Sequence, residues 1–127
     1  MKVKILITII AVSVFAVSAY AEKKKHPEKW YQEKWCAARG GQAEVRLPDR
    51  TRVDCLTDEY AIEFDFGRKH AEALGQALYY AIKTGKKAGI VLIVGKRGQR
   101  YIDRLNTVIT FYKLPVRVWV MAERKEG

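Results

Sequence analysis

Three carboxylate residues in the middle of the chain have the types and the spacing that metal-dependent hydrolysis uses. Asp54 lies in a β-rich run at residues 52–57, and Glu63 and Asp65 lie in a second run at residues 60–66. Two such runs separated by a two-residue loop predict a β-hairpin. In the second run, alternation along the strand places Glu63 and Asp65 on one face and the apolar side chains on the other. The apolar face is expected to pack against a helix.

The chemistry depends on the register of this hairpin. If the chain turns at residues 58–59, Asp54 lies opposite Glu63 and Arg52 lies opposite Asp65. Directly opposed side chains stand about 5 Å apart at Cβ, so two carboxylates placed in this way repel each other. A divalent cation would remove the conflict, because Mg²⁺ binds one or two carboxylates together with water and phosphate oxygens. Asp-Glu is not a favoured tight-turn pair, and a slip of one residue would spoil the arrangement.

The alternative is a hairpin that faces solvent and carries its acids by chance. In that case Arg52 and Asp65 form a surface ion pair, and no metal is involved.

Helices and strands alternate around the hairpin in the order αβββαβαβ. Residues 89–94 are apolar on both faces and predict a central strand covered by helices. One mixed sheet flanked by helices is the natural architecture for this order. The helix at 68–84 is expected to bury an apolar face made of Ala71, Leu74, Leu78 and Ile82. The other predicted helices span residues 28–38 and 99–112, and the other predicted strands span residues 43–47 and 116–121.

These residues, in this order of elements, resemble the PD-(D/E)XK nuclease superfamily. Its signature is an acid on the second strand, Glu-x-Lys on the third strand and often a glutamine on the next helix. The matching segments here are Arg-Val-Asp at 52–54, Ile-Glu-Phe-Asp at 62–65 and the helix at 72–80 with its Gly-Gln-x-x-x-Tyr. The resemblance covers about residues 30–94. It implies a restriction-endonuclease-like αβββαβ core, here followed by a C-terminal helix and strand.

The resemblance also implies roles for single residues. Asp54 and Glu63 would bind Mg²⁺ or Mn²⁺, and Gln76 would orient groups beside the metal. Many relatives place a further glutamate of the first helix near the metal, and Glu33 is the matching position. An exposed helix charge is the alternative for Glu33, and an ordinary polar position is the alternative for Gln76.

One position departs from the family pattern. Asp65 stands where the family usually has a lysine that positions or deprotonates the attacking water. Asp65 could then be a third metal ligand, and Lys69 of the following helix could supply the missing cation. The resemblance thus implies a metal-dependent nuclease that hydrolyses phosphodiesters. The departure equally fits an inactive nuclease-fold domain that binds nucleic acid or another polyanion in the cell envelope.

The charge of the chain favours polyanionic partners. Its 24 Lys and Arg residues exceed its 14 Asp and Glu residues, which gives a formal net charge of +10. Such an excess attracts nucleic acid, acidic glycans or anionic lipid head groups, although a soluble exported protein can also be basic without binding any of them. Nucleic acid, and DNA in preference to RNA, is the expected partner. Lys96, Arg97 and Arg100 form one candidate contact surface, with a solvated basic loop as the alternative.

The N-terminus has the pattern of a secretory signal peptide. Lys2 and Lys4 precede an apolar run at residues 5–17, and the stretch ends in the small-x-small pattern Ala-Tyr-Ala at 19–21. The run is short for a bilayer core of about 30 Å, and an uncleaved anchor is the alternative. Cleavage after residue 21 would leave residues 22–127 as a single domain. That domain is expected in the periplasm or the medium, without stable membrane association.

The two cysteines support an oxidising compartment. Cys36 and Cys55 both lie in the expected mature domain, and an isolated pair in an exported protein is most simply a disulfide. Two buried free thiols are the alternative. The two histidines, His26 and His70, are distant in the sequence, which disfavours a zinc site.

Overall fold

A five-stranded mixed sheet forms the centre of the protein, and its strands lie side by side in chain order, β1-β2-β3-β4-β5. The structure is a computed structural model that describes residues 21–127, so the predicted signal peptide lies outside the described residues except for Ala21. The elements are α1 (Glu28–Ala38), β1 (Gln42–Arg46), β2 (Arg52–Leu56), β3 (Tyr60–Phe66), the 3₁₀ turn η1 (Gly67–Lys69), α2 (His70–Thr84), β4 (Lys87–Val94), α3 (Gln99–Phe111) and β5 (Val116–Ala122).

The first three strands are antiparallel, and β4 and β5 continue the sheet in parallel to β3. In the β2–β3 hairpin, Cys55 pairs with Ile62 and Leu56 pairs with Ala61. The N–H of Thr57 donates a hydrogen bond to the carbonyl oxygen of Tyr60 over 2.9 Å and closes the turn. This is the register expected from a turn at residues 58–59, so that prediction is confirmed.

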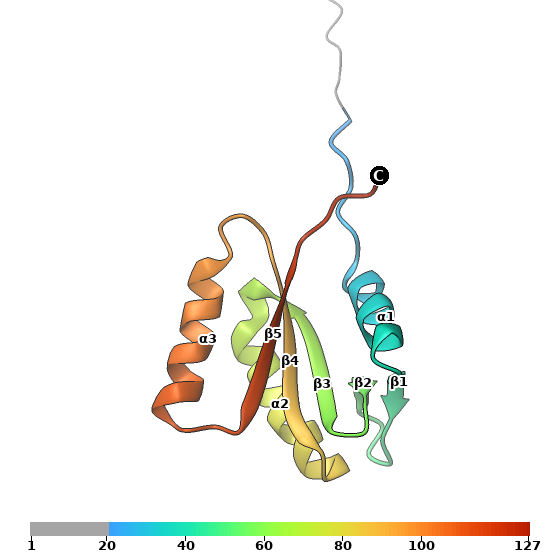
Figure 1. The fold of residues 1–127 in the computed structure, drawn as a ribbon, viewed down its shortest axis with the longest axis vertical. Helices are drawn as coiled ribbons and strands as arrows, with labels where there is room; N and C mark the ends of the chain where they lie inside the picture. Colours follow the sequence, from blue (N-terminus) through green and yellow to red (C-terminus); the bar gives the residue numbers. More distant parts are fainter. Residues whose placement is uncertain (1–20) are drawn as a thin grey trace, which may run out of the picture.

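Helices cover both faces of the sheet, with α1 on one face and α2 and α3 on the other (Figure 1). Alternation along β4 gives each face its own core: Val91 and Ile93 pack toward α1, and Ile90 and Leu92 pack toward α2 and α3. All four side chains are buried, as expected for a central strand covered by helices. The mixed α/β architecture predicted from the sequence is therefore confirmed.

The buried face of α2 differs from the predicted one. Ala73, Ala77 and Tyr80 are buried, whereas Ala71 is exposed and Ile82 has 80% of its surface exposed. The alanines have no side chain beyond Cβ, so the helix can lie close to the sheet along their line. Leu74 and Leu78, which were expected in the core, are partly buried beside this line. The apolar spacing in the sequence therefore predicted a buried face that is rotated about the helix axis relative to the observed buried face.

A disulfide joins α1 to β2. Cys36 and Cys55 are bonded, with their Cα atoms 5.8 Å apart, which confirms the predicted pair. Gly41 lies against both sulfur atoms, and a Cβ at this position would stand 2.7 Å and 2.8 Å from them. The bond therefore fixes the first helix on the sheet beside the hairpin.

Tyr31 ties α1 to the C-terminal segment. Its hydroxyl accepts a hydrogen bond from the N–H of Arg124 over 2.7 Å.

Residues 21–127 include no helix long and apolar enough to cross a membrane.

Replacing both cysteines, Cys36→Ala with Cys55→Ala, should lower the free energy of unfolding by about 3 kcal/mol, because the open chain gains conformational entropy when it unfolds. Urea denaturation followed by tryptophan fluorescence would measure the loss. Dithiothreitol should produce a similar loss in the wild-type protein and no change in the double variant. Equal urea midpoints for the wild-type protein and the double variant would contradict a stabilising role.

Candidate active site

Strands β2 and β3 separate where the carboxylates lie. The backbone pairing of the two strands ends at Cys55 and Ile62. Beyond that pair, the side chain of Asp54 makes the contact between the strands. The Asp54 carboxylate accepts a hydrogen bond from the N–H of Phe64 over 2.8 Å. On the other side, the Gln32 amide of α1 donates to the Asp54 carbonyl over 2.7 Å. Beyond this point of separation, polar side chains of β2 and β3 line a common hollow.

The space beside this separation is a hollow of about 450 Å³. Asp54, Glu63 and Asp65 line it, and their exposed fractions are only 7%, 5% and 3%. We call this hollow, together with the side chains that line it, the acidic site. Its remaining lining residues are Glu28, Arg46, Arg50, Arg52, Lys69, Glu72, Gln76 and Tyr80. The three acids predicted to act together are thus close neighbours in the fold.

The carboxyl groups of the acidic site form two contacting pairs. Asp54 lies within hydrogen-bonding reach of Glu63, and Glu28 lies within reach of Asp65. Burial raises the pKa of Glu63 well above its usual range, and the neighbouring charge of Asp54 raises that pKa further. Burial also raises the pKa of Asp54, although the hydrogen bond from Phe64 opposes this shift. The pair therefore favours sharing a proton or binding a cation.

The second pair joins the buried Asp65 to Glu28 of α1, which is half-buried. Burial, followed by the charges of Asp65 and Asp54, raises the pKa of Glu28 to about 7. Burial raises the pKa of Asp65 to about 6, against the lowering effect of the Lys69 ammonium group. The Nζ atom of Lys69 lies 4.0 Å from an oxygen of Asp65. These carboxyl groups change their charge close to neutral pH.

Two observations bear on whether the acidic site suits a metal. The Oε2 atom of Glu63 is buried and has no hydrogen-bond partner among the described residues, and a buried acceptor without a partner is costly. Among residues 21–127, no three His, Cys, Asp or Glu side chains are arranged as a ready metal cage. Mg²⁺ needs no such cage, because it keeps several waters and commonly takes one or two carboxylates. Asp54 and Glu63 fit that sparse mode of binding.

The glutamate of α1 that lines the acidic site is Glu28, and the predicted Glu33 does not reach it. Glu33 is exposed on α1, with an oxygen 3.8 Å from the Nζ atom of Lys29. Five residues along a helix turn the side chain by about 140°, so Glu28 and Glu33 point in different directions. Glu28 and Gln32 are four residues apart and share one face of α1. That spacing places the two side chains together, but the sequence does not show which face of α1 points to the site, and the family pattern indicated Glu33.

The other predicted residues divide between two places. Lys69 and Gln76 line the acidic site, where the Gln76 amide donates to Glu72 over 3.2 Å. Arg97 and Arg100 line a different hollow beyond the end of β3, and Lys96 lines neither of the two.

Arginines of β1 and β2, and of the turn between them, form a rim that the sequence patterns did not indicate. Arg46, Arg50 and Arg52 all line the acidic site. Arg52 lies 3.9 Å from a carboxylate oxygen of Glu44, and the Arg52–Asp65 ion pair of the alternative, solvent-facing hairpin is absent from the ion pairs of residues 21–127.

The chain matches no family model, no curated protein and no solved structure. The fold and the site together define a mixed α/β domain with a buried acidic site and a basic rim. Any assignment of function must therefore rest on the chemistry of that site.

The raised pKa values predict an unusual pH dependence of stability. An acid whose pKa is higher in the folded state than in the unfolded state binds more protons when folded. Stability is then present at low pH and declines as pH rises. In EDTA, the free energy of unfolding should fall between about pH 5 and pH 8, because Asp65 titrates with a pKa near 6 and Glu28 with a pKa near 7. Urea denaturation across this range would measure it, and a rise over the same range would contradict the assignment.

The variant Glu63→Gln should differ little from the wild type at pH 8 in EDTA. Burial and the charge of Asp54 raise the pKa of Glu63 to about 10, so its protonated carboxyl group can donate a hydrogen bond to Asp54 there, as the amide of the variant can. As pH rises through that pKa, the wild type should lose stability relative to the variant by roughly 1–3 kcal/mol, the usual cost of an unsatisfied buried polar group. Urea denaturation at pH 8 and above the pKa of Glu63 would measure the difference. Glu33→Gln, which changes an exposed acid on α1, is the matched control and should leave stability unchanged.

Proposed function

We propose that this protein is an exported, metal-dependent nuclease of the PD-(D/E)XK type. The observation that carries the proposal is the buried Asp54–Glu63 pair at the point where β2 and β3 separate. Acids with strongly raised pKa values cost a small domain stability, and such groups cluster at functional sites. The orphaned Oε2 atom of Glu63 adds to this cost, and a divalent cation would offset it.

The arrangement of elements supports the same class. The order α1, β1, β2, β3, α2, β4 is the αβββαβ order of the restriction-endonuclease-like core, and α3 with β5 extends the sheet. The acids lie on the second and third strands, as the family signature requires. Glu28 adds a first-helix glutamate at the acidic site, although at a different position from the one first expected.

Asp54 and Glu63 would hold Mg²⁺ or Mn²⁺, with Asp65 as a further carboxylate beside them. When bound, such a metal lowers the pKa of a coordinated water and offsets negative charge on the phosphoryl group. The protein supplies the remaining functions from its own side chains. The fold places the carboxylates around one hollow, and their burial limits their contact with bulk water.

Lys69 takes the place of the missing family lysine. It comes from η1, directly after β3, and its Nζ atom lies 4.0 Å from Asp65. An ammonium group at this position would stabilise negative charge that develops on a phosphate oxygen. Gln76 lies on α2 and also lines the acidic site. Its amide is held between Glu72 and the hydroxyl of Tyr80, which fixes its orientation.

The basic rim would bind the nucleic acid backbone. Arg46, Arg50 and Arg52 line the opening of the acidic site, where their positive charge can pair with phosphates on either side of the scissile bond. Contacts of this kind position a strand without reading its sequence. We expect DNA in preference to RNA as the substrate.

Export completes the proposal. The N-terminal signal peptide pattern and the disulfide both favour the periplasm or the extracellular medium. Metal ions and nucleic acid released from cells are both accessible in those places.

A cleavage assay on the disulfide-bonded protein tests the function. Linear, supercoiled and single-stranded DNA and RNA would be incubated with Mg²⁺, Mn²⁺ or EDTA, and products would be resolved on gels. Asp54→Asn and Glu63→Gln should each lower the cleavage rate at least 100-fold, because each removes a carboxylate that would hold the metal. Glu33→Gln is the matched control and should cleave like the wild type.

The variant Lys69→Met should lower the rate about 10- to 100-fold while leaving metal-dependent stabilisation intact. Metal-independent cleavage, or full activity in both carboxylate variants, would reject the proposed mechanism. If no cleavage occurs with any metal while DNA binding persists in EDTA, the protein is a binding domain on a nuclease scaffold.

A further inference from the structure

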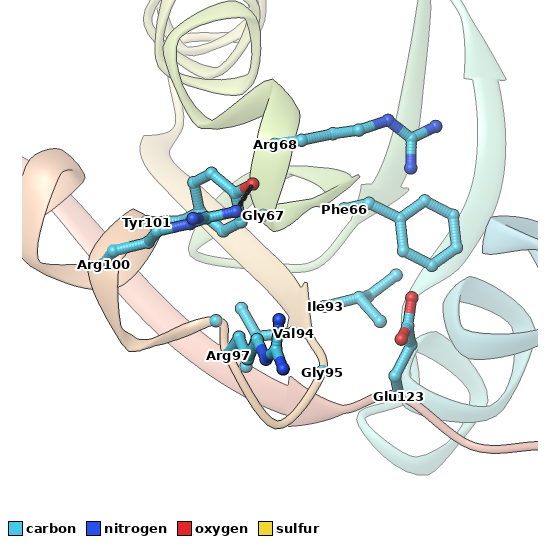
Figure 2. A pocket seen from close by; sticks show the side chains of 11 residues that line it. Phe66, Gly67, Arg68, Ile93, Val94, Gly95, Arg97, Arg100, Tyr101 and Glu123 are labelled. Atoms are coloured by element: carbon cyan, nitrogen blue, oxygen red, sulfur yellow. Dashed lines mark hydrogen bonds between the residues drawn. The ribbon is translucent and has the colours of Figure 1, made fainter.

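A second hollow, of about 180 Å³, lies beyond the carboxyl end of β3, between the turn η1 and the beginning of α3 (Figure 2). We call it the arginine pocket, because Arg68, Arg97 and Arg100 line it. They come from three separate segments: η1, the loop after β4 and the first turn of α3. Arginine side chains from three separate segments thus border one small space, and guanidinium groups are well suited to pair with phosphate and other anions.

The three guanidinium groups are available to a ligand. Within residues 21–127, none of them lies within 4.0 Å of a carboxylate oxygen. Arg68 stands over the ring of Phe66, 5.6 Å from its centroid, and Arg100 donates to the Tyr101 hydroxyl over 2.8 Å. Neither contact neutralises the charge of the arginine, so the pocket can attract a negatively charged group.

One carboxylate also lines the arginine pocket, and it is neutralised. Glu123 accepts a hydrogen bond from the Nζ atom of Lys25 over 2.9 Å. The pocket therefore keeps the positive charge of its three arginines.

The beginning of α3 adds to the attraction for anions. Gly98 precedes the helix and provides no side-chain cap, and the first turn of α3 contains no acidic residue. The first N–H groups of a helix lack intrahelical acceptors and carry partial positive charge. Gly98, Arg100 and Tyr101 line the pocket, so the first turn of α3 borders the same space as the arginines.

The size and position of the arginine pocket identify its ligand. Pockets that take whole drug-sized molecules measure roughly 300–1,000 Å³, so this smaller hollow suits a single group. It is also next to the acidic site in the chain: in η1, Arg68 lines the pocket while the neighbouring Lys69 lies beside Asp65. A strand bound at the acidic site would have this pocket on the other side of η1.

We propose that the arginine pocket binds a phosphate group of the nucleic acid strand next to the scissile bond, and so sets the position of the strand over the acidic site. The inference rests on the proposed nuclease function and adds a specific anchor to it. The ligand chemistry is a phosphate group held by guanidinium groups. The bound phosphate group would be either the terminal phosphate of the strand or one of its internal phosphodiesters.

Binding in EDTA separates this proposal from catalysis. Fluorescence anisotropy would measure the affinity of the disulfide-bonded protein for a 12-nucleotide single-stranded DNA that carries either a 5′-phosphate or a 5′-hydroxyl. The double variant Arg97→Gln with Arg100→Gln should raise the Kd about tenfold and reduce the salt slope by about 0.7 for each phosphate charge that it no longer neutralises. Arg68→Gln should show a smaller change of the same kind. Arg104→Gln, an exposed arginine of α3 outside the pocket, is the matched control and should bind like the wild type.

The two oligonucleotides identify the source of the phosphate. Weakened binding of the 5′-phosphorylated strand alone supports a terminal phosphate, and weakened binding of both strands supports an internal one. An equal loss of affinity in the Arg104→Gln control, or no loss in the pocket variants, overturns the proposal. So does arginine-dependent binding to phosphatidylserine vesicles without any to DNA.

The failures of the two proposals are distinguishable. Cleavage that persists with unchanged DNA affinity in the pocket variants rejects the arginine pocket alone. Arginine-dependent DNA binding by a wild-type protein that never cleaves rejects the nuclease function and retains a phosphate pocket in a binding domain.

Discussion

The electrostatic conflict between Asp54 and Glu63 is the constraint on which the rest of the site depends. Both carboxyl groups are nearly inaccessible to water and lie within hydrogen-bonding reach of each other. Taking ionised groups out of water is costly unless something compensates their charge. The domain must therefore supply stability elsewhere to hold them there, through the covalent link between α1 and β2 and through cores on both faces of β4.

The separation of β2 from β3 links the fold to the chemistry. The Asp54 carboxylate replaces a backbone acceptor for the N–H of Phe64, so the strands part without leaving that donor unpaired. From α1, the side-chain amide of Gln32 donates a hydrogen bond to the backbone carbonyl of Asp54. The helix that the disulfide fixes is thus also the helix that supports the acidic site and brings Glu28 to it. Stability and site geometry depend on the same contacts.

Charge is distributed in a way that suits a polyanionic substrate. The acids are buried, while exposed arginines line the acidic site and the separate arginine pocket. A phosphate backbone would meet positive charge before it reached the carboxylates, which alone would repel it. With this distribution, an overall basic protein can contain a strongly acidic centre, because positively charged residues surround it.

The sequence by itself determined the order of the elements, the register of the hairpin and the sharing of one site by Asp54, Glu63 and Asp65. These features follow from local patterns: strand alternation, turn position and apolar runs bounded by glycine or proline. The tertiary structure alone decided that Glu28 and not Glu33 reaches the site, that α2 buries Ala73 and Ala77, and that Arg68 joins Arg97 and Arg100. The rotation of a helix about its axis and the meeting of distant loops depend on packing between elements, which no local pattern encodes.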